Sequence, residues 1–200
     1  TIWDCGTYVG YYTVIFSKLA GQTGKVVALE PDPHNLERTK ANVALNGLNN
    51  VQFVHAAIGA PIGITDFVVS GNTNSHLPGG YTGKDYQQYA PIERHNETIQ
   101  VRCMSLDEAY ASPQIPSPSL VKLDIEGAEK EALNHLQHLA QICRPLIVLE
   151  LHNPECDAAA WEFAVRENYT LRSLNTGSVI QNRDDVNGTL LCFPSSSPFG

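Results

Sequence analysis

The first residues with the chemistry of a binding site are a carboxylate and two glycines near the start of the chain. They stand in the pattern D-x-G-x-x-x-G, formed by Asp4, Gly6 and Gly10. An apolar stretch precedes this turn and a helical pattern follows it, and a glycine turn between a strand and a helix usually receives a ligand. A second carboxylate, Glu30, ends the next apolar run at residues 25–30. An acidic residue there can accept hydrogen bonds from both hydroxyls of a ribose, so the ligand is expected to contain a nucleoside.

The charge of the turn separates two classes of nucleoside cofactor. Dinucleotides use G-x-G-x-x-G and place a pyrophosphate against the turn. Here the middle glycine is missing, and the carboxylate of Asp4 would repel phosphate. S-adenosylmethionine carries an ammonium, a sulfonium and a ribose but no phosphate. The pattern therefore favours S-adenosylmethionine, with Asp4 at its amino group, the amides of the turn at its carboxylate and Glu30 at its ribose. A tight strand-to-helix turn without a ligand is the alternative.

A second set of polar residues lies in the segment K-L-D-I-E-G-A-E, which begins at Lys122. Asp124 falls at the carboxyl end of an expected strand, Glu126 in the turn that follows, and His152 at the end of the next strand. These two strands are expected to be neighbours, so Asp124 and His152 should face one another at the edge where ligands bind. A hydroxyl group that accepts a methyl group must lose its proton, and all three side chains are candidate general bases. His152 is preferred, because an imidazole with a pKa of about 6.5 can take a proton at neutral pH.

Each of these residues also has another interpretation. His152 can be a structural histidine, and Glu126 and Glu129 can favour the positive end of the next helix. Asp124, Glu150 and His152 can form a metal site of two carboxylates and an imidazole, because Glu150 and His152 alternate onto one face of their strand. No metal is predicted from the sequence, and this set stays an alternative.

The elements that must position these residues alternate between strands and helices. Short apolar runs predict strands that end near residue 4 and that cover residues 25–30, 51–59, 120–124 and 145–151. Helical spacing predicts helices at residues 9–20, from 33 to about 46, at 132–143 and at 158–167, the first with an apolar face of Val9, Ile15, Phe16 and Leu19. Asp32 is the expected N-cap of the second helix and Gly47 its C-terminal stop. This order predicts a doubly wound, mostly parallel α/β sheet, closed by an antiparallel pair at residues 170–174 and 189–193.

One segment interrupts this alternation. Residues 64–69 and 98–103 both alternate like strands, and a loop rich in Gly, Asn, Tyr and Pro separates them. We expect a hairpin with a long loop at its tip, because loops of this length in compact domains are often lids or binding elements. The loop at residues 71–96 contains Tyr81, Tyr86 and Tyr89, and it is predicted to cover a small-molecule acceptor.

Composition limits the classes of partner. The chain has 200 residues and a formal charge of −8, and its 13 Lys and Arg residues are scattered. This balance argues against broad nucleic-acid binding, and no apolar run is long enough to span a bilayer. The five cysteines form no C-x-x-C pair, which indicates free thiols in a reducing compartment, and the expected location is the cytoplasm. Residues 1–200 are interpreted as one domain that starts inside a strand, so an N-terminal part is expected to be missing. The oligomeric state is not predicted.

Residues 1 to about 152 resemble FkbM-type methyltransferases. The most specific similarities are E-P-D-P after the second strand and K-L-D-I-E-G-A-E after the strand that begins near Leu120. The resemblance implies a class I methyltransferase fold and methyl transfer from S-adenosylmethionine, usually to a hydroxyl group of a sugar or another secondary metabolite. From their positions and chemistry, His152, Asp124 and Glu126 are the predicted catalytic residues. The predicted cofactor-binding residues are Asp4, Gly6, Tyr8, Gly10, Glu30, Pro31, Ala57 and Asp124.

Two other functions remain open. A nicotinamide-dependent reductase shares this fold, but its short-chain form would need Tyr-x-x-x-Lys, and no tyrosine here has a lysine four residues later. A non-catalytic module that binds a nucleoside cofactor would keep the glycine turn and Glu30 without transferring a group. A screen of methyl acceptors would distinguish an enzyme from such a module.

Overall fold

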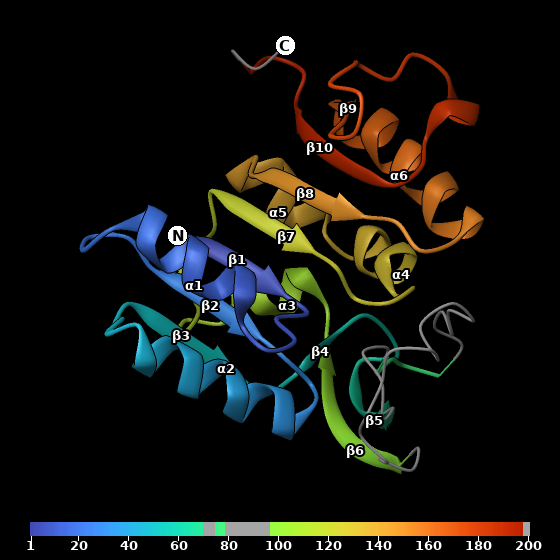
Figure 1. Cartoon of the computed structure of the whole chain (residues 1–200). Helices are drawn as coiled ribbons and strands as arrows, with labels where there is room; N and C mark the ends of the chain where they lie inside the picture. Colours follow the sequence, from blue (N-terminus) through green and yellow to red (C-terminus); the bar gives the residue numbers. More distant parts are fainter. Residues whose placement is uncertain (70–74, 79–96, 198–200) are drawn as a thin grey trace.

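The computed structural model describes residues 1–69, 75–78 and 97–197. Five parallel strands make up most of its main sheet (Figure 1): β1 (Ile2–Cys5), β2 (Val26–Leu29), β3 (Val51–Val54), β7 (Leu120–Leu123) and β8 (Leu146–Glu150). β10 (Thr189–Pro194) runs antiparallel to β8, and β9 (Tyr169–Ser173) pairs antiparallel with β10 at the edge. The seven strands have the order β3-β2-β1-β7-β8-β10-β9. The predicted mostly parallel α/β sheet with an antiparallel closing pair is confirmed.

The strand order locates the ligand-binding edge. From β1 the chain first moves outward through β2 and β3, and later returns to the other side of β1 with β7 and β8. The sheet therefore has its topological switch point between β1 and β7, and ligands of open α/β sheets bind outside the carboxyl ends of the strands at such a point. Asp4 pairs with Lys122 in this register, so the glycine turn after β1 and the acidic turn after β7 emerge side by side.

Helices cover both faces of the main sheet (Figure 1). α1 (Tyr11–Ala20) and α2 (Pro33–Leu45) contact each other and pack on β1, β2 and β3. The opposite layer contains α3 (Leu106–Ala111), α4 (Glu129–Asn134), α5 (Gln137–Cys143) and α6 (Pro154–Glu167), and a short 3-10 helix (Arg183–Asp185) precedes β10. The predicted caps of α2 are confirmed: the side chain of Asp32 accepts the N–H groups of His34 and Asn35, and Gly47 follows the helix with φ of +66°.

The predicted apolar face of the first helix is wrong. The helix begins at Tyr11 instead of residue 9, and Leu19 is 75% exposed. Its buried residues are Thr13 and Ser17, whose hydroxyl groups donate hydrogen bonds to Asp4 and Asn50. Polar side chains point inward because the sheet beneath this helix contains a buried carboxylate that needs a donor.

Two predicted elements are each divided. The strand expected at residues 51–59 ends at Val54, and its second half, β4 (Ala57–Ile58), joins a separate sheet with β6 (Glu97–Met104) and β5 (Gly63–Val69) in the order β4-β6-β5. The helix expected at residues 132–143 breaks between α4 and α5. The carboxylate of Asp107 in α3 accepts the N–H groups of His138 and Leu139, so a distant side chain starts α5 as a new helix.

The expected hairpin is confirmed by the antiparallel pairing of β5 with β6, for example Thr65 with Val101. Within the predicted lid, residues 75–78 are described: the backbone of His76 pairs with that of Val68, and Leu77 is buried. The other residues of the predicted lid, including its three tyrosines, lie outside the described residues.

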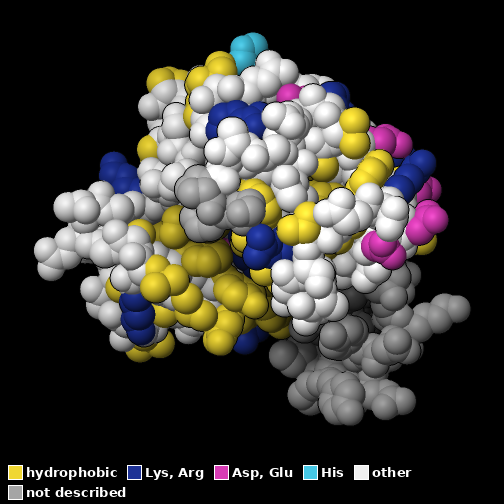
Figure 2. Space-filling model, turned by 90° about the horizontal axis from the view of Figure 1, so that it is seen from above, with side chains coloured by type: hydrophobic (Ala, Val, Ile, Leu, Met, Phe, Trp, Pro, Cys, Tyr) yellow, Lys and Arg dark blue, Asp and Glu magenta, His cyan; other side chains and the backbone are white. Residues whose placement is uncertain are grey.

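The α1 side of the main sheet is only partly covered beyond β1. Leu120, Val148 and Leu191 occupy register positions on this side and are half-buried. Figure 2 shows a broad patch of hydrophobic side chains on the face of the molecule seen from above. None of the helices in the described part of the chain is long and apolar enough to cross a membrane. All five cysteines are free thiols, as expected.

Candidate active site

The glycine turn after β1 approaches the backbone of Asp124 so closely at Gly6 that only glycine fits there. Gly6 has φ of +80°, and a Cβ atom there would lie 1.9 Å from the carbonyl oxygen of Asp124. Tyr8 and Gly10 also have positive φ, of +51° and +83°. L-residues with side chains rarely adopt these angles. The turn can therefore lie directly against the carboxyl end of β7.

Side chains of α2 hold this turn. The hydroxyl of Thr39 donates a hydrogen bond to the carbonyl oxygen of Tyr8 at 2.9 Å, and the side-chain amide of Asn42 donates one to the carbonyl of Val9 at 2.7 Å. A Cβ atom on Gly10 would lie 2.7 Å from the Thr39 methyl group. The turn is thus fixed by residues some thirty positions later in the sequence.

Glu30 joins the turn to the start of α2. Its carboxylate accepts the N–H of Tyr8 at 2.9 Å on one oxygen and the N–H of Asp32 at 3.0 Å on the other. The residue is only 4% exposed. Burial raises the pKa of Glu30 to about 8, and the two backbone donors oppose this shift. Glu30 still borders the cavity beside the turn, so it is both a support of the turn and a wall of the site.

Asp4 lies deeper in the protein and does not line the cavity. It is fully buried, and the hydroxyl of Thr13 donates a hydrogen bond to its Oδ2 at 2.6 Å. Its other oxygen has no hydrogen-bond partner among the described residues. Burial raises the pKa of Asp4 to about 6, while the charge of Lys122 opposes this shift. The cavity does not expose Asp4, so the expected direct contact between Asp4 and an ammonium group is not supported by its position.

A cavity of about 240 Å³ opens beside the turn. Of the predicted cofactor-binding residues, all except Asp4 and Gly10 line it: Gly6, Tyr8, Glu30, Pro31, Ala57 and Asp124. Its apolar walls were not predicted, and they include Ile58, Phe67, Leu77 and Ile125. Phe67 and Leu77 come from the hairpin segment, which the alternating pattern of residues 64–69 could have indicated. The lining residues that the structure describes include the carboxylates of Glu30, Asp124 and Glu126 but no Lys or Arg.

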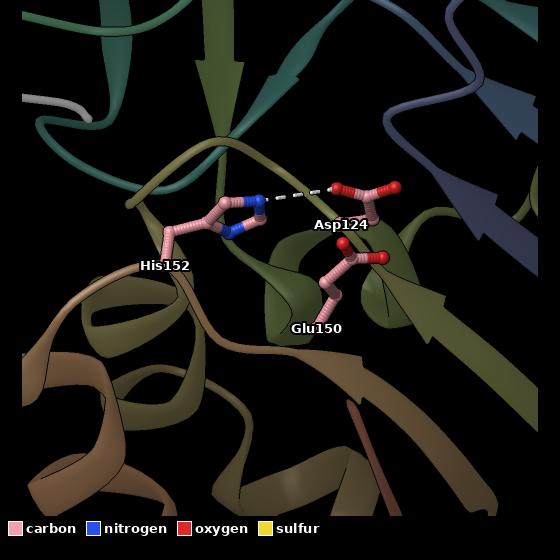
Figure 3. A group of neighbouring side chains, drawn as sticks. All are labelled: Asp124, Glu150 and His152. Atoms are coloured by element: carbon pink, nitrogen blue, oxygen red, sulfur yellow. Dashed lines mark ion pairs between the residues drawn. The ribbon is translucent and has the colours of Figure 1, made fainter. Parts of the chain in front are cut away.

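The second polar set gathers where β7 and β8 end (Figure 3). Nε2 of His152 lies 3.6 Å from Oδ1 of Asp124 and 3.8 Å from Oε2 of Glu126. The structure therefore brings Asp124 and His152 together as expected. The other oxygen of Asp124 accepts a hydrogen bond from Nζ of Lys122 at 2.9 Å, and that ammonium group also lies 4.9 Å from the ring centroid of Tyr12. Although burial alone would lower the pKa of Lys122, the charges of Asp124 and Asp4 raise it.

Glu129 is the centre of this set, a role that sequence reasoning missed. Its side chain is fully buried and accepts hydrogen bonds from the backbone N–H groups of Ile125 and Gly127. Oε1 of Glu129 also accepts a hydrogen bond from Nδ1 of His152 at 2.9 Å. The sequence interpretation assigned Glu129 only to the start of a helix. The spacing E-G-x-E was the available signal, because it places a carboxylate two residues beyond a glycine turn.

The electrostatics of the set change the expected role of His152. Although burial alone would lower its pKa, the hydrogen bond to Glu129 and the charges of Glu129, Glu126 and Asp124 raise the pKa of His152 to about 9. The expectation of an ordinary pKa near 6.5 is therefore wrong, because the neighbouring carboxylates favour the protonated imidazole. Burial raises the pKa of Glu126 to about 7, while the charge of His152 opposes that shift.

Comparison of the sequence with known proteins identifies the family of this chain. The sequence pattern described as "Methyltransferase FkbM domain" matches residues 4–174. The hexuronic acid methyltransferase AglP of Haloferax volcanii is 24% identical over 151 residues, which are 76% of this chain and 55% of that protein. A protein-L-isoaspartate O-methyltransferase of Methanococcus maripaludis is 37% identical over 51 residues, which are 26% of this chain and 24% of that protein. The chain thus spans about half, or less, of the length of these curated relatives.

A solved structure extends the comparison to the fold. The crystal structure of methyltransferase FkbM from Methylobacillus flagellatus KT has a TM-score of 0.54 and 18% identity, over 96% of this chain and 43% of that chain. The fold is accordingly the Rossmann-like fold of class I methyltransferases. Since the family pattern covers most of its length, the chain belongs to the FkbM methyltransferase domain family.

Proposed function

We propose that this domain transfers a methyl group from S-adenosylmethionine to a hydroxyl group of a sugar or another small metabolite. The observation that carries the proposal is the cavity at the switch point. It joins the glycine turn and the buried carboxylate of Glu30 on one side to the acidic turn after β7 on the other.

The charge of the cavity distinguishes the cofactor. Its described lining residues include three carboxylates, those of Glu30, Asp124 and Glu126, and no Lys or Arg. The described lining therefore offers no cationic side chain to a pyrophosphate, which argues against the nicotinamide-dependent reductase. A cofactor with a sulfonium and an ammonium group fits the same lining, because opposite charges attract at short range in a partly buried site.

The individual residues fit the parts of this cofactor. Glu30 borders the cavity with a carboxylate that can accept the hydroxyls of a ribose, while the apolar walls at Ala57, Ile58 and Phe67 suit the flat face of an adenine. Gly6 borders the cavity without a side chain, so its backbone is accessible to a cofactor. These residues therefore fit the group that the family implies.

The acidic turn faces the place of reaction. When bound, S-adenosylmethionine supplies an electrophilic methyl group, whose bonding electron pair stays on the sulfur as the methyl leaves. Asp124 and Glu126 line the cavity there, and His152 contacts both carboxylates. We assign these three residues to the acceptor: they orient its hydroxyl group, and a carboxylate of this set takes the hydroxyl proton as the new carbon–oxygen bond forms. Holding the two reactants in line supplies much of the rate.

The class of acceptor rests on the relatives. AglP is named as a hexuronic acid methyltransferase, which supports a sugar as the acceptor, although this chain covers only 55% of that protein. The carboxylates of the cavity and Tyr8 in the glycine turn also suit an acceptor with several hydroxyl groups, which can make several hydrogen bonds. A non-catalytic binding module is the competing function, because it would use the same cofactor cavity.

Two measurements test the proposal. Calorimetric titration with S-adenosylhomocysteine and with NAD should show binding of the first and none of the second. A screen of sugars with methyl-labelled S-adenosylmethionine should then show label transfer that Asp124→Asn reduces by at least about 100-fold, within the range for loss of acid–base help. Binding of NAD alone would refute the cofactor. Cofactor binding without transfer to any hydroxyl-bearing acceptor would leave the binding module as the function.

A further inference from the structure

We propose that Asp124, Glu150 and His152 bind a divalent metal ion beside the cofactor cavity, with Mn²⁺ as the ion that fits the donor set best. The three side chains come from the ends of two neighbouring strands, β7 and β8, and point toward a common space (Figure 3). One donor atom of each lies within 4.8 Å of the others. Donor atoms that share one ion at roughly 2.0–2.3 Å lie about 3–4.5 Å apart, so small side-chain rotations are sufficient to close the site.

The orientation of the imidazole supports this assignment. Nδ1 of His152 donates to Glu129, whose fully buried carboxylate is in turn held by the N–H groups of Ile125 and Gly127. This arrangement fixes the ring so that Nε2 faces Asp124. A bound ion would displace the proton from Nε2, because a ligating imidazole must be neutral. Metal-binding histidines almost always donate their other ring N–H to a carboxylate or carbonyl, which sets the tautomer and the direction of the ligating nitrogen. Glu129 is such a partner for His152, and its side chain is fully buried.

The division of contacts on Asp124 leaves one oxygen for an ion. Oδ2 accepts a hydrogen bond from Nζ of Lys122, whereas Oδ1 faces Nε2 of His152 at 3.6 Å. Asp124 can therefore act as a ligand through Oδ1 without giving up its contact with Lys122.

The local charge also favours a cation. Four carboxylates gather here, on Asp124, Glu126, Glu129 and Glu150, against the ammonium group of Lys122 and the imidazole of His152. Glu150 is half-buried, and the charges that act on its carboxyl group are those of Asp124, His152, Lys122 and Glu129. Carboxylates held this closely repel one another in a partly buried site, and a divalent ion would offset that repulsion.

The donor set selects among divalent ions. Two carboxylates and one imidazole contain too few oxygen donors for a typical Ca²⁺ site, and the set lacks the thiolates and additional imidazoles of structural zinc sites. Carboxylates suit Mn²⁺, and Mn²⁺ belongs to the divalent transition-metal series whose later members favour imidazole. Three protein ligands leave further coordination positions open. If the proposed methyl transfer is correct, a hydroxyl group of the acceptor can take one of these positions, where the ion lowers its pKa.

Titration with MnCl₂ tests the site without any catalytic readout. Electron paramagnetic resonance of free Mn²⁺ in the presence of the purified chain should show one bound ion per chain. Glu150→Gln and Asp124→Asn should each weaken this binding at least about tenfold, since loss even of a second-layer partner costs that much. Glu162→Gln is the matched control, because Glu162 is an exposed carboxylate of α6 paired only loosely with Arg183 at 3.5 Å, and its Mn²⁺ affinity should equal that of the unchanged protein.

The outcomes separate this inference from the proposed function. Circular dichroism first establishes that each variant is folded. Absence of Mn²⁺ binding at millimolar concentration, or equal binding by the Glu150→Gln and Glu162→Gln variants, would overturn the metal site. Binding of S-adenosylhomocysteine, measured separately, does not depend on Glu150, so cofactor binding and label transfer that persist in EDTA would remove the metal while leaving the methyltransferase intact. Mn²⁺ binding without methyl transfer to any acceptor would support the metal site and contradict the proposed methyltransferase activity.

Discussion

Replacement of Glu30 by glutamine tests the cofactor side of the site. The carboxylate of Glu30 accepts one backbone N–H on each oxygen, from Tyr8 at 2.9 Å and from Asp32 at 3.0 Å. Glutamine keeps the shape but replaces one oxygen by an NH₂ group. One of the two backbone donors then faces a donor, and leaving a buried N–H without an acceptor costs about 1–3 kcal/mol of the free energy of unfolding.

The same substitution removes the charge that is expected to accept the ribose hydroxyls. Hydrogen bonds to charged groups contribute about 1.5–3 kcal/mol, so above pH 8, where the carboxyl group of Glu30 is ionised, the affinity for S-adenosylhomocysteine should fall roughly 10- to 150-fold. Urea unfolding and calorimetric titration measure the two effects separately on the same preparation. Glu37→Gln is the control, because Glu37 is an exposed residue of α2 whose side chain is 71% accessible and pairs only with Lys40.

Two results would contradict the proposed contact between Glu30 and the ribose. If the folded Glu30→Gln variant binds S-adenosylhomocysteine within about twofold of the unchanged protein, the ribose contact does not exist. If the affinity of the Glu37→Gln variant falls equally, the loss is a general effect of charge and not a property of this site. Glu30→Ala would be a poorer test, since it removes the acceptor for both backbone donors and would combine lost binding with lost folding.

Three further predictions follow from the site. Because burial raises the pKa of Glu30 to about 8, its carboxyl group takes up a proton as the pH falls below about 8; cofactor affinity should therefore fall from pH 8 toward pH 6, and titrations of the Glu30→Gln variant should lack this component. Gly6→Ala should lower the free energy of unfolding by well over 1 kcal/mol, since its Cβ would lie 1.9 Å from a carbonyl oxygen. Gly47→Ala is the control, because Gly47 follows α2 at φ of +66° with open space around it and should cost only about 1 kcal/mol; equal losses in urea unfolding would mean that the glycine turn has room to move. Replacing residues 79–96 by a short Gly/Ser linker should raise the KM for the acceptor and leave cofactor affinity nearly unchanged, and a parallel loss of both would show that this segment is structural and not a lid.

The sequence by itself determined the architecture and the edge of the sheet that carries the site. Apolar runs such as residues 26–29 and 146–150 are short and continuous, which is typical of strands covered on both faces, and they became β2 and β8. The positions of Glu30, Asp124 and His152 after such runs were enough to bring them to one edge, because parallel strands end together. These features depend on local order along the chain, and local order is what a sequence pattern records.

Only the tertiary structure decided which of these side chains reach the cavity and what charge they carry. Asp4 is buried beneath α1, where Thr13 donates a hydrogen bond to it, and the pKa of His152 is raised because the turn after β7 brings Glu126 and Glu129 to its ring. The inward face of α1 is polar instead of apolar because it packs over the buried carboxylate of Asp4. Burial and the distances between charges arise from packing between segments distant in sequence, so spacing along the chain does not determine them.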